Sequence, residues 1–253
     1  MDSEKTLVYL ILGTAGSGRR AVLADLIDGG LTETGRPAVL LSDAEKATPA
    51  DAKLASVTRW HWTGEFIEAR LPAEATHVFF VTDGRSNPVD QIEVFKAWIE
   101  AQGAELARVI CIVDCQLAEK HAPLVAWYDA CVHFSDIVLL SRREGVENKW
   151  LSDFQVHFKS RYIPALFELV KADRVKNPAL VLEPQARRMS HVFDEDQDWV
   201  FTDAEGAEIE EDEETEGDEE VEATIAEDPY FERLNGGRRV KELPDIRKFL
   251  SAD

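Results

Sequence analysis

The stretch Leu7–Leu26, which reads LVYLILGTAGSGRRAVLADL, constrains the fold more than any other part of the chain. A continuous apolar run of strand length is followed by three closely spaced glycines, and then by apolar residues at helical spacing. This succession of strand, glycine-rich turn and helix is typical of a phosphate-binding loop, where backbone N–H groups and the helix N-terminus favour an anion. Glycine is needed because a Cβ would hinder both the tight turn and the approach of a phosphate. The candidate ligand-binding residues of this loop are Gly13, Gly16, Ser17, Gly18, Arg19 and Arg20.

The residues that would handle terminal phosphates and a metal ion are replaced in this loop. In the full pattern, G-x-x-x-x-G-K-[ST], the lysine contacts the β- and γ-phosphates and the hydroxyl ligates Mg²⁺. Gly13 and Gly18 match, but Arg19 stands at the lysine position and Arg20 at the hydroxyl position. A guanidinium neutralises phosphate charge but cannot ligate Mg²⁺. The loop favours anion binding over a plain turn that binds nothing, and we assign no catalytic and no metal-binding residue.

Strand-like runs alternate with helical segments through residues 4–184, which we interpret as one domain. The expected strands are Leu7–Leu12, Ala38–Leu41, His77–Thr82, Ala107–Val113 and Asp136–Leu140. The expected helices include Thr63–Leu71, Pro88–Gln102, Leu117–Cys131 and Lys149–Val170, while Ala44–Lys53 is expected to be a polar loop and Ala179–Leu182 is a last apolar run. Because the strands are apolar on both faces, they predict an α/β fold with a P-loop NTPase-like parallel sheet and helices on both faces.

Ligands bind at the carboxyl ends of the strands in such sheets, and several polar residues stand there. They are Asp43, Asp83, Asp114 and Ser141. Asp83 and Asp114 could hold a metal ion or a water molecule, or could cap the helices that follow, and the sequence leaves both interpretations open.

A soft-metal site formed by the three cysteines and His61 is a further possibility. The spacing of Cys111, Cys115 and Cys131 is poor for metal ligands, which favours buried thiols that behave as small hydrophobic side chains. An odd number of cysteines in a chain of this length suits reduced thiols, so we expect a cytoplasmic protein.

The net charge of −21 is concentrated in one block. Residues 194–228 carry nineteen acids and no lysine or arginine, which leaves thirty acids against twenty-eight bases elsewhere. A nearly neutral domain lacks the basic surface that nucleic-acid binding requires. No apolar run reaches the length of a membrane span, so we expect neither nucleic acid nor membrane as a partner.

The composition changes after Pro184. We interpret residues 185–228 as an acidic linker, with a possible hairpin made by Trp199–Phe201 and Ala207–Ile209, and we expect Glu210–Glu222 to be disordered. Residues 229–253 restore apolar and basic side chains, which suggests a tethered segment that docks on a protein partner. Two alternatives are that this segment folds back on its own domain, or that its arginines pair with the acidic run.

Four fragments together resemble the CobW/HypB/UreG family of metal-associated P-loop GTPases, in particular its CobW branch. ILGTAGSGRR resembles GFLGSGKT, VTDGRSNP resembles the switch segment ETSGLADP, CIVDC resembles VVDA, and FSDIVLLSRRE resembles FADVILLNKxD. The fragments occur in the family's order between Leu7 and Leu182. The resemblance implies GTP or another nucleotide as the ligand, with Asp83 and Gly84 at the switch and Ser141 and Glu144 near the base.

The departures from the family pattern fall on its working positions. Val81 stands at the family's glutamate, Ser141 and Arg142 replace the base-reading pair, and Trp60-His61-Trp62 replaces the metal-binding C-x-C-C. These losses favour a degenerate nucleotide-binding domain with weak or absent GTP hydrolysis that acts as an interaction or regulatory module. The alternative is an active GTP-binding metallochaperone GTPase of the CobW type.

Overall fold

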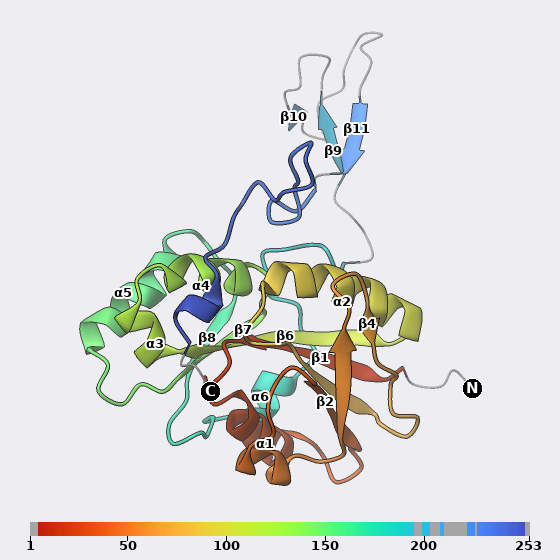
Figure 1. Ribbon diagram of the computed structural model, residues 1–253, viewed down its shortest axis with the longest axis vertical. Helices are drawn as coiled ribbons and strands as arrows, with labels where there is room; N and C mark the ends of the chain where they lie inside the picture. The colour runs from red at the N-terminus through yellow and green to blue at the C-terminus, as the bar shows by residue number, and fades with distance from the viewer. Residues whose placement is uncertain (1–4, 195–198, 203–207, 210–221, 226, 251–253) are drawn as a thin grey trace. The chain divides into compact units, whose positions relative to one another are not determined.

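The computed structural model describes residues 5–194, 199–202, 208–209, 222–225 and 227–250 (Figure 1). The chain divides into two compact units, of which the first comprises Met1–Met189 with Leu243–Asp253 and the second comprises Ser190–Glu242. The sequence placed the corresponding boundaries at residues 184 and 228. Among the described residues, no helix is long and apolar enough to cross a membrane.

The first unit contains one eight-stranded sheet in the order β4-β3-β2-β5-β1-β6-β7-β8. Its strands are β1 (Leu7–Gly13), β2 (Pro37–Ser42), β3 (Val57–Trp62), β4 (Ile67–Glu68), β5 (His77–Val81), β6 (Glu105–Asp114), β7 (Ile137–Ser141) and β8 (Leu166–Leu169). All neighbouring strands pair in parallel except β3 and β4, which are antiparallel. The predicted parallel sheet is therefore confirmed, with one antiparallel edge strand.

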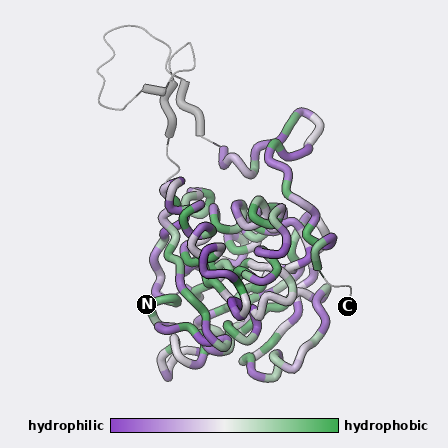
Figure 2. The backbone as a smooth tube through the Cα atoms, turned by 90° about the vertical axis from the view of Figure 1, so that its left-hand side faces the viewer, coloured by the Kyte–Doolittle hydropathy of each residue, from purple (hydrophilic) through white to green (hydrophobic). Residues whose placement is uncertain are grey.

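Helices cover both faces of this sheet, as predicted (Figure 1). They are α1 (Arg19–Gly30), α2 (Pro88–Gln102), α3 (Cys115–Lys120), α4 (Leu124–His133), α5 (Asn148–Lys159) and α6 (Pro178–Leu182), with 3₁₀ turns η1 (Pro49–Lys53) and η2 (Ile246–Lys248). Helices α1 and α6 lie on one face, and α2 to α5 lie on the other. The buried hydrophobic core includes residues of β1, β2, β5, β6 and β7. Figure 2 shows hydrophobic and hydrophilic residues along the chain.

Strand β1 lies in the middle of the sheet, between β5 and β6. Residues 8–13 are all buried, because a central strand of such a sheet has no face exposed to water. The parallel register places Gly13 beside Ile112 of β6, and Asp114 of β6 beside Ser141 of β7. The carboxyl ends of β1, β2, β5, β6 and β7 thus meet at one edge, which is where the sequence placed its candidate ligand-binding residues.

Two predicted helices are wrong. Thr63–Leu71 is not helical, because residues 63–68 form a tight turn and the short strand β4, which pairs with β3. The helix expected over Lys149–Val170 ends at Lys159, and the chain then returns along the sheet as β8. Pro164 explains this second error, since proline lacks the N–H that a helix interior needs and disfavours helical backbone in the residue before it. The last apolar run, Ala179–Leu182, belongs to helix α6.

The second unit contains a three-stranded antiparallel sheet in the order β10-β9-β11. Its strands are β9 (Trp199–Thr202), β10 (Glu208–Ile209) and β11 (Glu222–Ile225). Strands β9 and β10 pair antiparallel where the sequence suggested a hairpin, and β11 was not predicted. Residues 210–221 lie outside the described residues, so disorder there stays a prediction.

Candidate functional site

The loop between β1 and α1 has the backbone of an anion cradle. Gly13, Gly16 and Gly18 have φ values of 137°, 84° and 85°, a region that favours glycine. A Cβ on Gly13 would lie only 2.4 Å from the carbonyl oxygen of Ile112. Helix α1 begins after Gly18 without a side-chain cap, so its N-terminal N–H groups remain suited to an anion.

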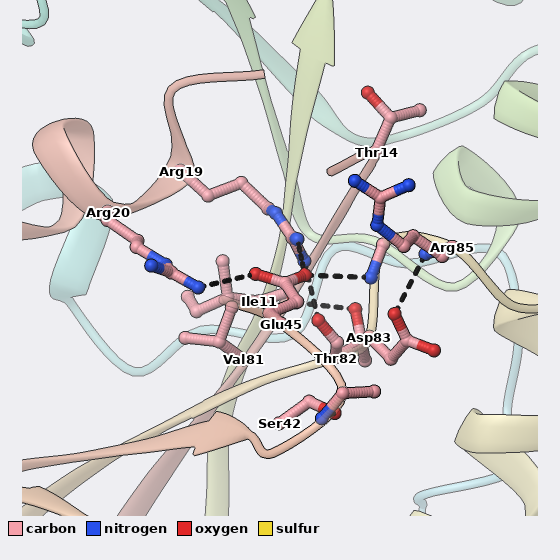
Figure 3. Close-up of polar contacts among 12 residues, drawn as sticks. Ile11, Thr14, Arg19, Arg20, Ser42, Glu45, Val81, Thr82, Asp83 and Arg85 are labelled. Carbon is pink, nitrogen blue, oxygen red and sulfur yellow. Dashed lines mark hydrogen bonds and ion pairs between the residues drawn. The ribbon is translucent and has the colours of Figure 1, made fainter. Parts of the chain in front are cut away.

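The two arginines of the loop are held by a network of backbone and carboxylate oxygens (Figure 3). Arg19 donates to the carbonyl oxygen of Thr82 at 2.6 Å and forms an ion pair with Glu45. Arg20 pairs with Glu45 at 2.9 Å and with Asp51 at 2.7 Å. Both arginines are buried, with exposed fractions of 4% and 8%. The cations at the lysine and hydroxyl positions are therefore neutralised by the protein itself.

Glu45 is the centre of this network. Its carboxylate bridges Arg19 and Arg20 and also accepts the backbone N–H of Gly84 at 3.0 Å. Burial alone would raise the pKa of Glu45, but the Arg19 guanidinium, the Gly84 N–H and Arg20 together hold this pKa below its ordinary value. The site thus contains a partly buried carboxylate that stays charged at neutral pH.

Sequence reasoning missed Glu45, because it placed this residue in a polar loop, Ala44–Lys53. The available signal was charge complementarity. Glu45 and Asp51 follow the second strand, while Arg19 and Arg20 stand side by side at the end of the glycine-rich loop.

The switch segment, residues 83–87, packs directly on the phosphate-binding loop. The N–H of Ala15 donates to the carbonyl oxygen of Gly84 at 2.9 Å, and a Cβ on Gly84 would lie 2.1 Å from that same nitrogen. Gln91 holds the segment from α2, because it accepts from the Asp83 N–H at 2.7 Å and donates to the Asp83 carbonyl oxygen at 2.9 Å. The closed contact between switch and loop therefore involves main-chain atoms on both sides.

The residues present do not fit Mg²⁺. Arg20 occupies the position that requires a hydroxyl, and Val81 is a buried apolar side chain where the family carries a glutamate. The carboxylate of Asp83 accepts the Arg85 N–H at 3.0 Å and the Ser86 hydroxyl at 2.5 Å. These carboxylate oxygens stabilise the turn, so we derive no step through a metal ion.

Asp114 caps helix α3, which is one of the two interpretations that the sequence left open. Its carboxylate accepts the N–H of Leu117 at 3.0 Å. Burial raises the pKa of Asp114, against the effects of that hydrogen bond and of Arg142, whose guanidinium lies 3.8 Å away.

Two neighbouring cavities, of about 350 and 280 Å³, adjoin the loop. Both are lined by Ala15, Gly16, Arg85 and Arg142. The larger one also reaches Gly18, Arg19, Arg20 and Glu45. The protein thus has space for an anion next to positively charged side chains, although Arg19 and Arg20 are already paired with Glu45.

The structure brings most of the predicted site residues together at this edge, but not all of them. The hydroxyls of Ser17 and Ser141 are buried, and neither has a hydrogen-bond partner among the residues that the structure describes. Ser141 Oγ lies 3.6 Å from the position of a Cβ on Gly18. Glu144 is exposed and lies outside the linings of both cavities, and its carbonyl oxygen accepts from Gln116 at 2.6 Å.

The cysteines and His61 do not share a site. Cys111, Cys115 and Cys131 are all buried, and burial raises the pKa of the Cys115 thiol to about 12. His61 is exposed and pairs with Asp43 at 2.8 Å. Within the described part of the chain, no three His, Cys, Asp or Glu side chains are grouped as metal ligands would be.

No protein-family model matches the sequence, and no curated protein matches it. Among solved structures, HypB from Helicobacter pylori in complex with nickel is similar at 17% identity over 66% of this chain and 79% of that chain, with a TM-score of 0.41. HypB from Archaeoglobus fulgidus is similar at 13% identity over 65% and 81%, with a TM-score of 0.45. Zn(II)-bound YjiA GTPase from E. coli is similar at 16% identity over 73% and 67%, with a TM-score of 0.43.

At these identities and TM-scores, the three structures support no conclusion about the chemistry of this chain. The chain's own sheet, with β1 in the middle and the glycine loop joining β1 to α1, shows an α/β fold with a P-loop NTPase-like parallel sheet.

Proposed function

We propose that this protein is a P-loop domain that keeps its switch segment closed without a nucleotide and serves as an interaction or regulatory module. The observation that carries the proposal is the position of the Glu45 carboxylate. It binds Arg19, Arg20 and the N–H of Gly84, which joins the phosphate-binding loop to the switch segment. In a working GTPase, the γ-phosphate and its Mg²⁺ order the switch segments. Here an internal anion makes the corresponding link.

Weak or absent GTP hydrolysis follows from the same contacts. Phosphoryl transfer depends on a metal ion and on cations that neutralise the charge developing on the phosphoryl oxygens. Arg20 excludes the hydroxyl ligand for Mg²⁺, and both loop arginines are already paired with carboxylates. A nucleotide phosphate would have to displace Glu45, so we expect weak nucleotide binding through the remaining glycine cradle.

The surface proposed for a protein partner is the segment of residues 228–242. Arg239 folds this segment locally, since its guanidinium donates to the carbonyl oxygen of Tyr230 at 3.1 Å and lies 5.6 Å from the centre of the Phe231 ring. Leu234 and Val240 remain exposed, at 53% and 43%. Exposed apolar side chains on a locally ordered segment suit a small docking motif.

Isothermal titration with GTP, GDP and ATP, each with and without Mg²⁺, tests the nucleotide side of the proposal. We expect weak binding that does not depend on Mg²⁺. Any GTP turnover in the preparation should be the same for the wild type and the loop variant Gly18→Asp. Tight, Mg²⁺-dependent binding of GTP would overturn the proposal and favour the active metallochaperone GTPase.

The partner side is tested with the double variant Leu234→Ser/Val240→Ser. We expect this variant to keep the wild-type melting temperature and to lose proteins that the wild type captures in a pull-down. An unchanged capture profile would contradict the assignment of this segment.

A further inference from the structure

The C-terminal strap, residues 243–250, adjoins both the switch segment and the phosphate-binding loop. Its first five residues line a cavity of about 360 Å³ together with residues 85–87 of the switch segment. Leu250 lines the cavity of about 280 Å³ beside the phosphate-binding loop, together with Ala15 and Gly16. The strap thus reaches the two segments that close on each other at the candidate site.

Side chains, rather than main-chain hydrogen bonds, hold the strap on the rest of the first unit. Ile246 is only 2% exposed, and the Phe249 ring lies 5.3 Å from the ring of His121, which lies between α3 and α4. Among the described residues, the backbone hydrogen bonds of the strap stay within it and form the short turn η2. The strap can therefore leave the domain without breaking a hydrogen bond of the sheet.

The strap packs loosely against the switch segment. The space of about 360 Å³ that they share is far larger than one water molecule needs, and side chains that border such a space lose packing contacts there. The charged residues of the strap pair mainly with each other, since Arg247 forms an ion pair with Asp245 at 2.9 Å. The pKa of Arg247 is raised first by Asp245 and less by Asp83 of the switch segment. A contact that rests on one buried isoleucine and one ring pair can be released.

Leu250 is an apolar side chain at a cavity whose other walls carry charge. Lys120 and Arg142 line this cavity, and the Asp114 carboxylate lies 3.8 Å from the Arg142 guanidinium. A phosphate group placed here would interact with these cations and with the glycine-rich loop, whereas Leu250 offers neither a charge nor a side-chain hydrogen bond. The docked Leu250 therefore takes up space that a polyphosphate would use.

We propose that the strap is an autoinhibitory latch on the switch segment and on the phosphate-binding loop. While docked, it restricts the movement of residues 85–87 and narrows the cavity at Leu250. When the strap leaves, the switch segment gains freedom and the cavity admits a polyphosphate. By linkage, a bound polyphosphate disfavours the docked strap to the same degree. This restraint is additional to the one made by Glu45, and it does not depend on the proposed function.

Hydrogen exchange measured by mass spectrometry tests the effect on the switch segment. It compares the wild type with full-length Ile246→Ser and with the deletion of residues 243–253. In both variants, we expect the amides of Ala15 and Gly84 to exchange about tenfold faster, because the restraint on the switch segment is lost. The amides of α6, on the opposite face of the sheet from α3 and α4, should exchange as in the wild type. Unchanged exchange at Gly84, or equal acceleration in α6, would overturn the proposal.

Isothermal titration with pyrophosphate, without a metal ion, tests the effect on the cavity. We expect the strap deletion to bind pyrophosphate about tenfold more tightly than the wild type, and full-length Leu250→Ala to bind it more tightly by a smaller factor. Leu180→Ala is the matched control and should bind as the wild type does, since this leucine is 38% exposed on α6 and lines neither cavity. Equal pyrophosphate affinity in all four proteins would overturn the proposal. Tight, Mg²⁺-dependent GTP binding by the wild type would contradict the proposed function alone, so the two failures are distinguishable.

Discussion

The carboxylate of Glu45 accepts the backbone N–H of Gly84 at 3.0 Å, and so ties the loop after β2 to the switch segment after β5. The same carboxylate neutralises the two arginines of the phosphate-binding loop. One side chain therefore joins the phosphate-binding loop, the loop after β2 and the switch segment. This arrangement leads to predictions for the removal of the carboxylate and for its protonation.

Replacing Glu45 with alanine should destabilise the protein and open the site to external anions. The substitution leaves Arg19 and Arg20 buried with one carboxylate fewer, and breaking such a buried pair costs about 3–5 kcal/mol. Inorganic phosphate should bind Glu45→Ala at least tenfold more tightly than it binds the wild type. Bound phosphate should also raise the melting temperature of the variant, since a ligand that binds only the folded state stabilises it.

Glu33→Ala is the matched control, because it removes an exposed carboxylate from the turn after α1. This control should change neither the phosphate affinity nor the melting temperature. If Glu45→Ala shows wild-type phosphate affinity, the carboxylate does not occupy an anion position.

The contribution of Glu45 should depend on pH in the acid range. Its pKa in the folded protein lies below the ordinary value of 4.5, so its stabilising effect is complete above that value and is lost as the pH falls through the folded pKa. The difference in unfolding free energy between the wild type and Glu45→Gln should therefore be largest near neutral pH and shrink below 4.5. Urea unfolding of both proteins at a series of pH values measures this difference. A constant difference across the series would show that the charge of Glu45 is not involved.

Gly84→Ala should disrupt the contact between the switch segment and the phosphate-binding loop. The added Cβ would lie 2.1 Å from the Ala15 nitrogen and 2.6 Å from the Thr14 carbonyl carbon, both of which are main-chain atoms. Since the backbone has to shift, we expect a loss of about 1–3 kcal/mol in thermal or urea unfolding. Gly236→Ala, where nothing lies within 4 Å of the added Cβ, should be close to neutral. Equal effects in the two variants would contradict the tight packing at Gly84.

The parts of the fold that the sequence predicted are those with local signals. The β1–loop–α1 unit carries its glycines and its change of periodicity within twenty residues, and helix α2 has the limits expected for it, Pro88–Gln102. The strands of this sheet that the sequence missed are β3, β4 and β8. Strands β4 and β8 lie at the two edges with two and four residues, and β3, with six residues, lies between β2 and β4. Such strands depend on pairing with a distant neighbour, which local periodicity does not report.

The candidate site was predictable only in its backbone. Glycines at positions 13, 16 and 18 predict the anion cradle, because few other residue types adopt their backbone conformations. The role of Glu45 depends on contacts across 26 and 39 positions in the sequence, to Arg19 and Gly84. No local sequence pattern distinguishes a loop acid that forms buried ion pairs from a loop acid that is solvated. The pairing of Glu45 with the two arginines was therefore found only in the structure.

The C-terminal strap, residues 243–250, should contribute to the stability of the first unit. The sequence suggested that residues 229–253 form a tethered segment that docks on a partner, with folding back on the domain as one alternative. In the structure, Ile246 is only 2% exposed, and the Phe249 ring lies 5.3 Å from the His121 ring of the first unit. These contacts favour the fold-back alternative for residues 243–250, while partner binding by residues 228–242 stays a prediction.

Ile246→Ala tests the strap directly. Truncating a buried isoleucine typically costs about 2–5 kcal/mol, so the melting temperature should drop clearly, and deletion of residues 243–253 should lower it at least as much. Val240→Ala is the matched control, because that side chain is 43% exposed in the second unit and its truncation should be nearly neutral. Differential scanning calorimetry of the three variants and the wild type measures the effect. If the strap deletion has the melting temperature of the wild type, residues 243–250 do not stabilise the domain. That result would favour the hypothesis that they dock on a partner.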